Sequence, residues 1–400
     1  MKGIIVLNPI LLKNGLIVTE KDVLVEHSIL IKNGIIDQIV LNSKMINDKG
    51  FTTVDCKNCY IMPGLIDIHS DSIEKIIVPR KGTKFSVGHA LYDIDRQMIS
   101  QGITSIYHSM TMANTSICNN RRTIKPDDVF HLCNLINKNT DLLINHRVHI
   151  RLELNTLDVV DDLVQYIKAG RVHELSFMDH TPGQGQYRDI KEFEKVINQQ
   201  YGEISEDKKK EIINICKRKR KLDRNQIEIL IKSSLAHGVA MAYHDVESRE
   251  QVDWMVKNNI NICEFPLNDD TAKYAMQRKL FCVVGSPNII MGRSQYNNAS
   301  AVDLLINNRA NVISSDYYSS SLLESIFILN RLYNISLPTA VGFATINPAA
   351  ALGISEKQGS IAEGKKADII IVDSLAEFPR VNMSIINGII KMRLNYLEEK

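Results

Sequence analysis

The chain has 400 residues, of which 44% are hydrophobic and 24% charged, the usual balance of a globular protein with a large core. Its formal net charge of +2 gives no strong overall field, so nucleic-acid binding is not expected. No apolar run approaches the roughly 18 residues that cross a bilayer, so a membrane partner is not expected either. The composition therefore excludes a largely disordered chain and argues against both kinds of partner.

Both ends of the chain are rich in short β-branched segments that are typical of strands. Such segments lie at residues 3–8, 28–34, 36–40, 367–373 and 384–393. The pairs Asn33-Gly34 and Asn387-Gly388 supply hairpin turns. We therefore predict one small β-sandwich domain built from residues 1–58 and 354–400.

Between these ends, short apolar strand candidates alternate with helical stretches, which is the pattern of βα units around a parallel sheet. The candidates are residues 60–70, 102–109, 148–155, 174–180, 239–245, 261–266, 281–287 and 311–317. Eight such units close a barrel. We predict an α/β fold in which residues 59–353 form a (β/α)₈ barrel of the TIM type, with catalytic groups at the carboxyl ends of its strands.

Residues 189–238 are rich in Lys, Glu and Ile and nearly free of Gly and Pro, so they predict helices inserted into the barrel. The basic run Lys217–Lys221 lies within them. It has two interpretations, a solvated helix face or a contact for a polyanion near the barrel rim.

The first candidate for metal binding is the segment Leu65–Asp71, an apolar strand that ends in His69-Ser70-Asp71. Residues two apart in an extended chain point to one face, so His69 and Asp71 converge. An imidazole nitrogen and a carboxylate oxygen are suitable ligands for a divalent cation.

The second candidate is Val148–Leu154, whose alternation places His149, Arg151 and Glu153 on one face. Charge there is costly unless a cation is present, and Glu153 at the strand end could bridge two cations. The alternative is a buried Arg151–Glu153 pair that serves packing.

His180 and His244 both end strand candidates, and Asp316 ends a third. One such histidine would ordinarily be a hydrogen-bonded structural residue, but two in equivalent positions favour ligands. His237 precedes Gly238 at a helix end and is interpreted as structural. Asp316 can bind a metal or accept the proton of an attacking water.

The order His-x-Asp, Glu, His, His and Asp resembles the amidohydrolase superfamily, as do Thr345–Ala349 and Gly359–Asp368. Within it, the segments around residues 69–82, 151–158, 176–189 and 243–248 are similar to the diphosphatases of phosphonate degradation. The resemblance implies hydrolysis of ribose methylphosphonate triphosphate to the 5-phosphate and pyrophosphate. It implies the metal ligands His69, Asp71, Glu153, His180, His244 and Asp316, with Asp316 a ligand or the general base.

The resemblance also implies a cofactor of one or two divalent metal ions, with zinc first and manganese or iron as alternatives. Arg80, Lys81 and Arg293 are expected to bind the triphosphate, unless they are solvated surface residues. The partner is then a phosphorylated small molecule, and assembly into a homo-oligomer stays open.

The seven cysteines are odd in number and scattered, which does not suit a disulfide framework and favours a reducing cytoplasm. Cys56 and Cys59 have CxxC spacing, but no second pair or nearby histidines complete a zinc site.

Two other functions remain open. One is a different amidohydrolase activity, namely cyclic-amide hydrolysis, amino-sugar deacetylation or base deamination. The other is a catalytically inactive barrel that serves as a scaffold. Such scaffolds usually lose ligands, and all six candidates are present here.

Overall fold

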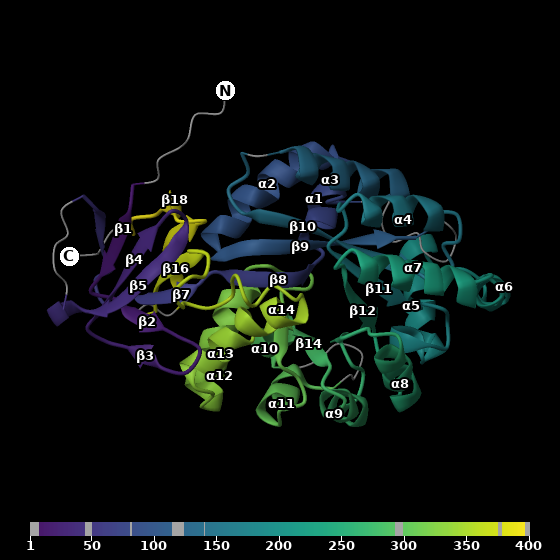
Figure 1. Cartoon of the computed structure of the whole chain (residues 1–400). Coiled ribbons are helices and arrows are strands. Elements are labelled where there is room, and N and C mark those ends of the chain that lie inside the picture. The colour runs from purple at the N-terminus through teal and green to yellow at the C-terminus, as the bar shows by residue number, and fades with distance from the viewer. Residues whose placement is uncertain are drawn as a thin grey trace.

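The protein is described by a computed structural model that covers residues 8–44, 50–80, 82–113, 124–139, 141–292, 299–374 and 378–396. Eight parallel strands form its main sheet, and their order in space follows the chain. The last strand returns to the first through a bridge between Ser70 and Asp316, so the sheet is nearly closed (Figure 1). The predicted (β/α)₈ barrel is confirmed. The strands are β8 (Leu65–Ser70), β9 (Ile103–Met112), β10 (Asn145–Glu153), β11 (Glu174–Met178), β12 (Ala240–His244), β13 (Ile262–Glu264), β14 (Phe281–Gly285) and β15 (Val312–Ser314).

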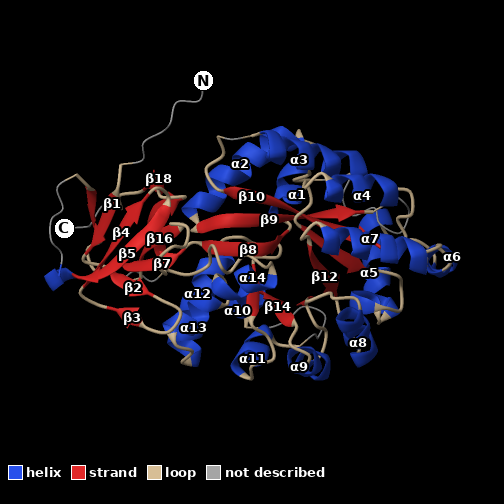
Figure 2. Cartoon of the chain, viewed as in Figure 1, coloured by secondary structure: helices blue, strands red, loops and turns tan. Residues whose placement is uncertain are grey.

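Helices surround these strands (Figure 2). Several begin where a side chain caps the first free N–H groups, as Ser86 does for α2 and the reciprocal pair Asp223 and Gln226 does for α7. The helices are α1 (Ser72–Ile77), α2 (Val87–Ser100), α3 (Pro126–Lys138), α4 (Val160–Lys168), α5 (Ile190–Tyr201), α6 (Glu206–Lys217), α7 (Arg224–Ala236), α8 (Arg249–Lys257), α9 (Asp269–Gln277), α10 (Ser286–Met291), α11 (Ala301–Ile306), α12 (Ser321–Tyr333), α13 (Leu337–Gly342) and α14 (Ile346–Ala351).

The segment that the sequence predicts as a helical insertion contains α5, α6 and α7. A short 3₁₀ turn, Gly185–Tyr187, leads into it. The helices α5 and α6 share a small hydrophobic cluster of their own, made of Tyr187, Phe193, Val196, Ile197, Ile212, Ile213 and Cys216. This cluster gives the insertion a fixed shape beside the barrel.

Two further sheets come from the chain ends, and Figure 1 shows them together at one side of the barrel. The four-stranded sheet contains β1 (Ile10–Lys13), β4 (His27–Lys32), β5 (Ile35–Leu41) and β6 (Thr52–Asp55), and a 3₁₀ turn at Asn42–Lys44 follows β5. The six-stranded sheet contains β2 (Leu16–Val18), β3 (Val23–Leu24), β7 (Tyr60–Pro63), β16 (Ile369–Asp373), β17 (Arg380–Ile386) and β18 (Ile389–Arg393). One hydrophobic cluster joins residues of both sheets, which confirms the predicted β-sandwich.

Strand β7 belongs to the sandwich, although the sequence places the start of the barrel at residue 59. It pairs with β16 and β2. Gly64 then separates β7 from β8, so one apolar run supplies a strand to each sheet.

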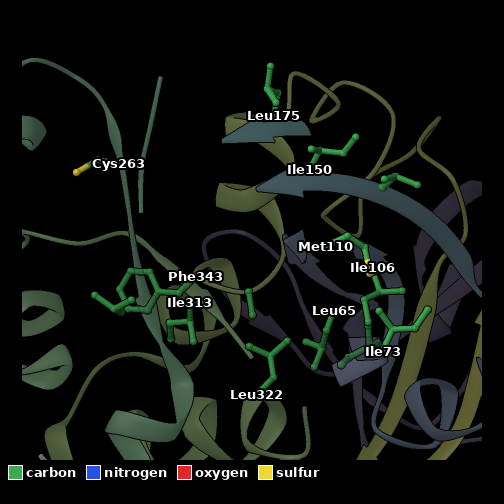
Figure 3. Close-up of a cluster of buried hydrophobic side chains, with 14 of the residues drawn as sticks. Leu65, Ile73, Ile106, Met110, Ile150, Leu175, Cys263, Ile313, Leu322 and Phe343 are labelled. Carbon is green, nitrogen blue, oxygen red and sulfur yellow. The ribbon is translucent and has the colours of Figure 1, made fainter. Parts of the chain in front are cut away.

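The main hydrophobic cluster lies between the barrel strands and the helices around them. It combines strand residues such as Leu65 and Ile150 with helix residues such as Ile73 and Leu322, several of which Figure 3 labels. Because both faces of each parallel strand are covered, the strands are almost continuously buried.

Within the described residues, the helices are all too short or too polar to cross a membrane. The thiols of Cys56, Cys59, Cys133, Cys263 and Cys282 are free. Cys216 is disulfide-bonded, which departs from the expectation of fully reduced cysteines.

We expect Gly64→Ala to destabilise the protein by about 1–3 kcal/mol, because the buried barrel start cannot admit a methyl group. A Cβ at Gly64 would lie 2.2 Å from Oγ1 of the buried Thr104. The measurement is thermal unfolding of the purified variant. The matched control is Gly88→Ala in α2, where the new Cβ would make an ordinary 3.8 Å contact with Leu135. Equal melting temperatures for the two variants would contradict this account of the junction.

Candidate metal centre

Acidic and imidazole side chains gather where the barrel strands end. Glu153, His244 and Glu264 are the last residues of β10, β12 and β13. His69 lies one residue before the end of β8, and His180 lies two residues after β11. Because all the strands are parallel, their carboxyl ends meet at one rim. The fold therefore brings together side chains that are far apart in the sequence.

One group of three ligand atoms comes from His180, His244 and Asp245. Oδ2 of Asp245 lies 3.2 Å from Nδ1 of His244 and 3.5 Å from Nε2 of His180. All three atoms are buried and make no hydrogen bond with any described residue. Such buried polar atoms are costly unless something pairs with them. Two imidazole nitrogens and a carboxylate oxygen fit a divalent cation.

Glu153 holds the His180 imidazole in place. Its Oε1 is hydrogen-bonded to Nδ1 of His180, and its Oε2 accepts a hydrogen bond from the His180 backbone N–H at 3.4 Å. This leaves Nε2 of His180 directed to Asp245. Burial alone would lower the pKa of His180, but the Glu153 and Asp245 carboxylates outweigh it and raise that pKa to about 9.

A second group comes from His69, His149 and Glu264. Oε1 of Glu264 lies 2.7 Å from Nδ1 of His69 and 3.9 Å from Nε2 of His149. Strands β8 and β13 are not neighbours in the sheet, so this contact crosses the barrel interior. Burial would raise the pKa of Glu264, but the two imidazoles outweigh it and lower that pKa, which favours the carboxylate. The bond at Nδ1 leaves Nε2 of His69 available to a cation.

Arg151 lies between the two groups. Its Nη1 donates to Oδ1 of Asp71 at 2.8 Å, and its Nη2 lies 3.3 Å from Nε2 of His244. Oδ1 of Asp71 is also 3.8 Å from Nε2 of His69. The packing alternative considered for Arg151 and Glu153 is therefore not what the structure shows, because Arg151 pairs with Asp71.

Asp316 is fixed against the end of β8 by its own backbone. Its N–H donates to the His69 carbonyl at 2.9 Å, and its carbonyl accepts from the Asp71 N–H at 2.7 Å. A side chain at Gly285 would come within 3.3 Å of Oδ2 of Asp316, so this carboxyl group is approached closely by a neighbouring strand. Burial, followed by the Asp71 carboxylate, raises the pKa of Asp316 to about 6.

Two more acids lie buried below the rim. Asp67 accepts hydrogen bonds from the backbone N–H of Ser315 at 3.0 Å and from its hydroxyl at 2.5 Å. Glu174 lies 3.6 Å from Nδ1 of His149, and burial raises its pKa well above the usual range. The neighbouring Glu264 carboxylate acts in the same direction, because two buried carboxylates side by side disfavour ionisation of the second.

The structure places all six predicted ligands at this rim: His69, Asp71, Glu153, His180, His244 and Asp316. The sequence interpretation missed Asp245 and Glu264 as site residues. Both fit the pattern that predicted the other ligands, an ionisable residue at the end of an apolar strand. Of the predicted triphosphate ligands, Arg80 is exposed and bonds Thr83 through Nε. Lys81 and Arg293 lie outside the described residues.

The sequence of the chain is similar to those of known hydrolases and related proteins, as the following matches show. The sequence profile of the Amidohydrolase family matches residues 217–393. The chain is 28% identical over 329 residues to alpha-D-ribose 1-methylphosphonate 5-triphosphate diphosphatase of Escherichia coli strain K12, covering 80% of this chain and 84% of that protein. A shorter region of 109 residues is 40% identical to imidazolonepropionase of Picrophilus torridus, covering 24% of this chain and 27% of that one.

Solved structures share the fold at low identity. N-acetylglucosamine-6-phosphate deacetylase from Pasteurella multocida aligns over 96% of this chain and 99% of that chain, with a TM-score of 0.63 and 10% identity. Dihydropyrimidinase from Brevibacillus agri aligns over 96% and 95%, with a TM-score of 0.64 and 12% identity. The chain is therefore similar in sequence to the Amidohydrolase family over residues 217–393, and its rim offers residues that could hold a metal.

We expect Asp245→Asn to reduce the amount of divalent metal that co-purifies with the protein, because an amide oxygen carries no charge to hold a cation between His180 and His244. The measurement is metal per chain by inductively coupled plasma mass spectrometry. The control is Asp270→Asn, which removes an exposed carboxylate paired with Arg249. Metal content that is unchanged in Asp245→Asn would exclude this residue as a ligand.

Proposed function

We propose that this amidohydrolase hydrolyses ribose 1-methylphosphonate 5-triphosphate to the 5-phosphate and pyrophosphate. The observation that carries the proposal is the resemblance to the Escherichia coli diphosphatase over most of both chains, combined with the cluster of unpartnered ligand atoms at the rim. In this reaction water adds to the phosphorus nearest the ribose. The bond to the bridging oxygen breaks, and pyrophosphate leaves with the electron pair.

The side chains have separate roles in this proposal. His180, His244 and Asp245 would hold the cation, and Glu153 keeps His180 turned toward it. The family pattern adds His69, Asp71 and Glu153 as further ligands, with Asp316 a ligand or the general base. A divalent cation bound there would lower the pKa of a coordinated water and offset the charge that develops on the phosphoryl oxygens. No covalent intermediate with the protein is required.

Asp316 is the proposed proton acceptor. Its carboxyl group is buried at the rim, and its backbone is held by two hydrogen bonds to the segment that carries His69 and Asp71. A fixed carboxylate beside the attacking water can take its proton without moving. The proton then passes to solvent with the product.

The short match to imidazolonepropionase favours one competing function, hydrolysis of a cyclic amide by the same residues. An amide substrate needs mainly neutral polar contacts, whereas a triphosphate needs cationic ones. The two functions therefore require different side chains in the loops around the rim, neutral polar ones for an amide and cationic ones for a triphosphate.

The purified, metal-loaded protein is expected to release one pyrophosphate per ribose 1-methylphosphonate 5-triphosphate consumed. The measurement is phosphorus NMR of the products, with cyclic amides, acetylated amino sugars and nucleobases assayed in parallel. Release of orthophosphate alone, or no turnover with the metal fully loaded, would reject the proposed reaction. Turnover of a cyclic amide instead would establish the competing function.

Asp316→Asn is expected to lower kcat by a factor of at least about 100, since general-base catalysis typically contributes that much. Metal content is expected to stay close to that of the wild-type protein if the residue acts on the proton. The comparison variant is Asp303→Asn on α11, which removes an acid in the first turn of an outer helix. An Asp316→Asn variant as active as the wild-type protein would count against this role.

A further inference from the structure

Arg151 places a guanidinium group inside the candidate metal centre. It lies two residues before Glu153 on β10, and the alternation of an extended strand directs both side chains to the same face. The side chain of Arg151 is only 11% exposed, and that of its partner Asp71 is 12% exposed. The ion pair between them is therefore largely removed from water, so loss of either partner would leave the other charge buried and uncompensated.

The guanidinium contacts two residues that the family pattern assigns to the metal. Its Nη1 donates to Oδ1 of Asp71 at 2.8 Å, and its Nη2 lies 3.3 Å from Nε2 of His244. The same Asp71 oxygen lies 3.8 Å from Nε2 of His69. The carboxylate oxygen that approaches His69 is thus already bound by a cation, and this cation is part of the chain itself.

The surroundings of Arg151 keep its positive charge in place. Burial would lower the pKa of the guanidinium, but nearby carboxylates outweigh burial and raise that pKa. These carboxylates belong to Asp71, Glu74, Glu264 and Asp316. An arginine in such surroundings stays protonated at every pH at which the protein is folded. The centre therefore has a permanent positive charge among its acids.

The group of His180, His244 and Asp245 has no such cation. Its three ligand atoms lie within 4.8 Å of one another. Oδ2 of Asp245 is buried and makes no hydrogen bond with any described residue, whereas Asp71 is bonded to Arg151. A bound divalent ion would compensate Asp245, and the guanidinium already compensates Asp71.

We propose that the centre binds one divalent ion per chain and that Arg151 takes the part of a second ion by neutralising Asp71. The inference deepens the proposed function, since it rests on a cation held by His180, His244 and Asp245. It also gives Asp71 a different part from that of the ligand implied by the family pattern. In two-metal hydrolases the second ion offsets charge on the reacting oxygens, and a fixed guanidinium beside the first ion can do the same.

The test counts metal ions in the full-length protein. Each preparation is saturated with zinc chloride, desalted and measured by inductively coupled plasma mass spectrometry. The wild-type protein is expected to hold about one ion per chain, and Arg151→Met about two, because the buried Asp71 carboxylate then lacks its cation. Arg151→Lys keeps the charge and should hold the wild-type amount. Two ions in the wild-type protein, or an unchanged count in Arg151→Met, would overturn the inference.

The matched control is Arg249→Met. It removes an exposed guanidinium from an ion pair with Asp270, whose side chains are 57% and 61% exposed. Because water compensates an exposed carboxylate, this variant is expected to keep the metal content of the wild-type protein. A second ion in Arg249→Met would show that the extra uptake reflects the lost surface charge and not the centre, which would also count against the inference.

A double variant identifies the group that Arg151 neutralises. Asp71→Asn combined with Arg151→Met removes both charges of the pair, so the count is expected to return to about one ion per chain. If Asp71 were instead a ligand of the resident ion, the double variant would hold clearly less metal than the wild-type protein. That result would show that Asp71 binds the metal and would refute the part given to Arg151.

The metal count and the proposed reaction can fail separately. The same preparations are assayed with ribose 1-methylphosphonate 5-triphosphate. If the counts are as expected and the triphosphate is not hydrolysed, the proposed function fails and the inference stands. If the wild-type protein hydrolyses it with two ions per chain, the reaction stands and the inference is wrong. The wild-type count needs no variant, so it decides even if Arg151→Met does not fold, which circular dichroism would show.

Discussion

The structure depends on one electrostatic constraint, the concentration of buried carboxylates and imidazoles at the carboxyl ends of parallel strands. A closed barrel directs every strand end to the same rim, so polar strand ends that are harmless in isolation become close neighbours. Glu264 and His69 are 195 residues apart in the sequence and 2.7 Å apart in space. Without compensation, such a cluster would be expensive to bury. Part of the compensation is internal, through Arg151, and the unpartnered atoms of His180, His244 and Asp245 leave room for a cation to supply the rest.

Much of this arrangement can be read from local sequence patterns. The two-residue spacing of His69 and Asp71 and the alternation before Glu153 indicate which side chains share a face, and the repeated strand–helix pattern indicates the barrel. These signals are short-range, because they follow from the geometry of an extended chain. The two-sheet domain from both chain ends is predictable for the same reason, since β-branched residues and Asn-Gly turns indicate where its strands lie.

The sequence does not reveal pairings that form across the barrel. Arg151 could pair with Glu153 on its own strand, and nothing local shows that it instead reaches Asp71 beyond β8. Local sequence patterns also do not reveal that residues 60–70 divide at Gly64 into two strands of different sheets. One continuous apolar run suits either sheet, and it is the pairing of β7 with β16 and β2, and of β8 with β9, that shows the division. Asp245 was missed because His244 beside it already explained the strand end.

The relation between the rim and its surroundings bears on what the chain acts on. Two proteins of known structure that share this fold at 10–12% identity are described as a deacetylase and a dihydropyrimidinase, so the barrel alone does not specify a substrate. Selectivity is then expected to depend on the segments around the strand ends. The insertion of α5 and α6 is one such segment, and it has a hydrophobic cluster of its own. The insertion continues into residues 218–223, where Leu222 bonds to Leu154 and Lys221 pairs with Asp179, so a basic sequence lies beside the candidate metal centre.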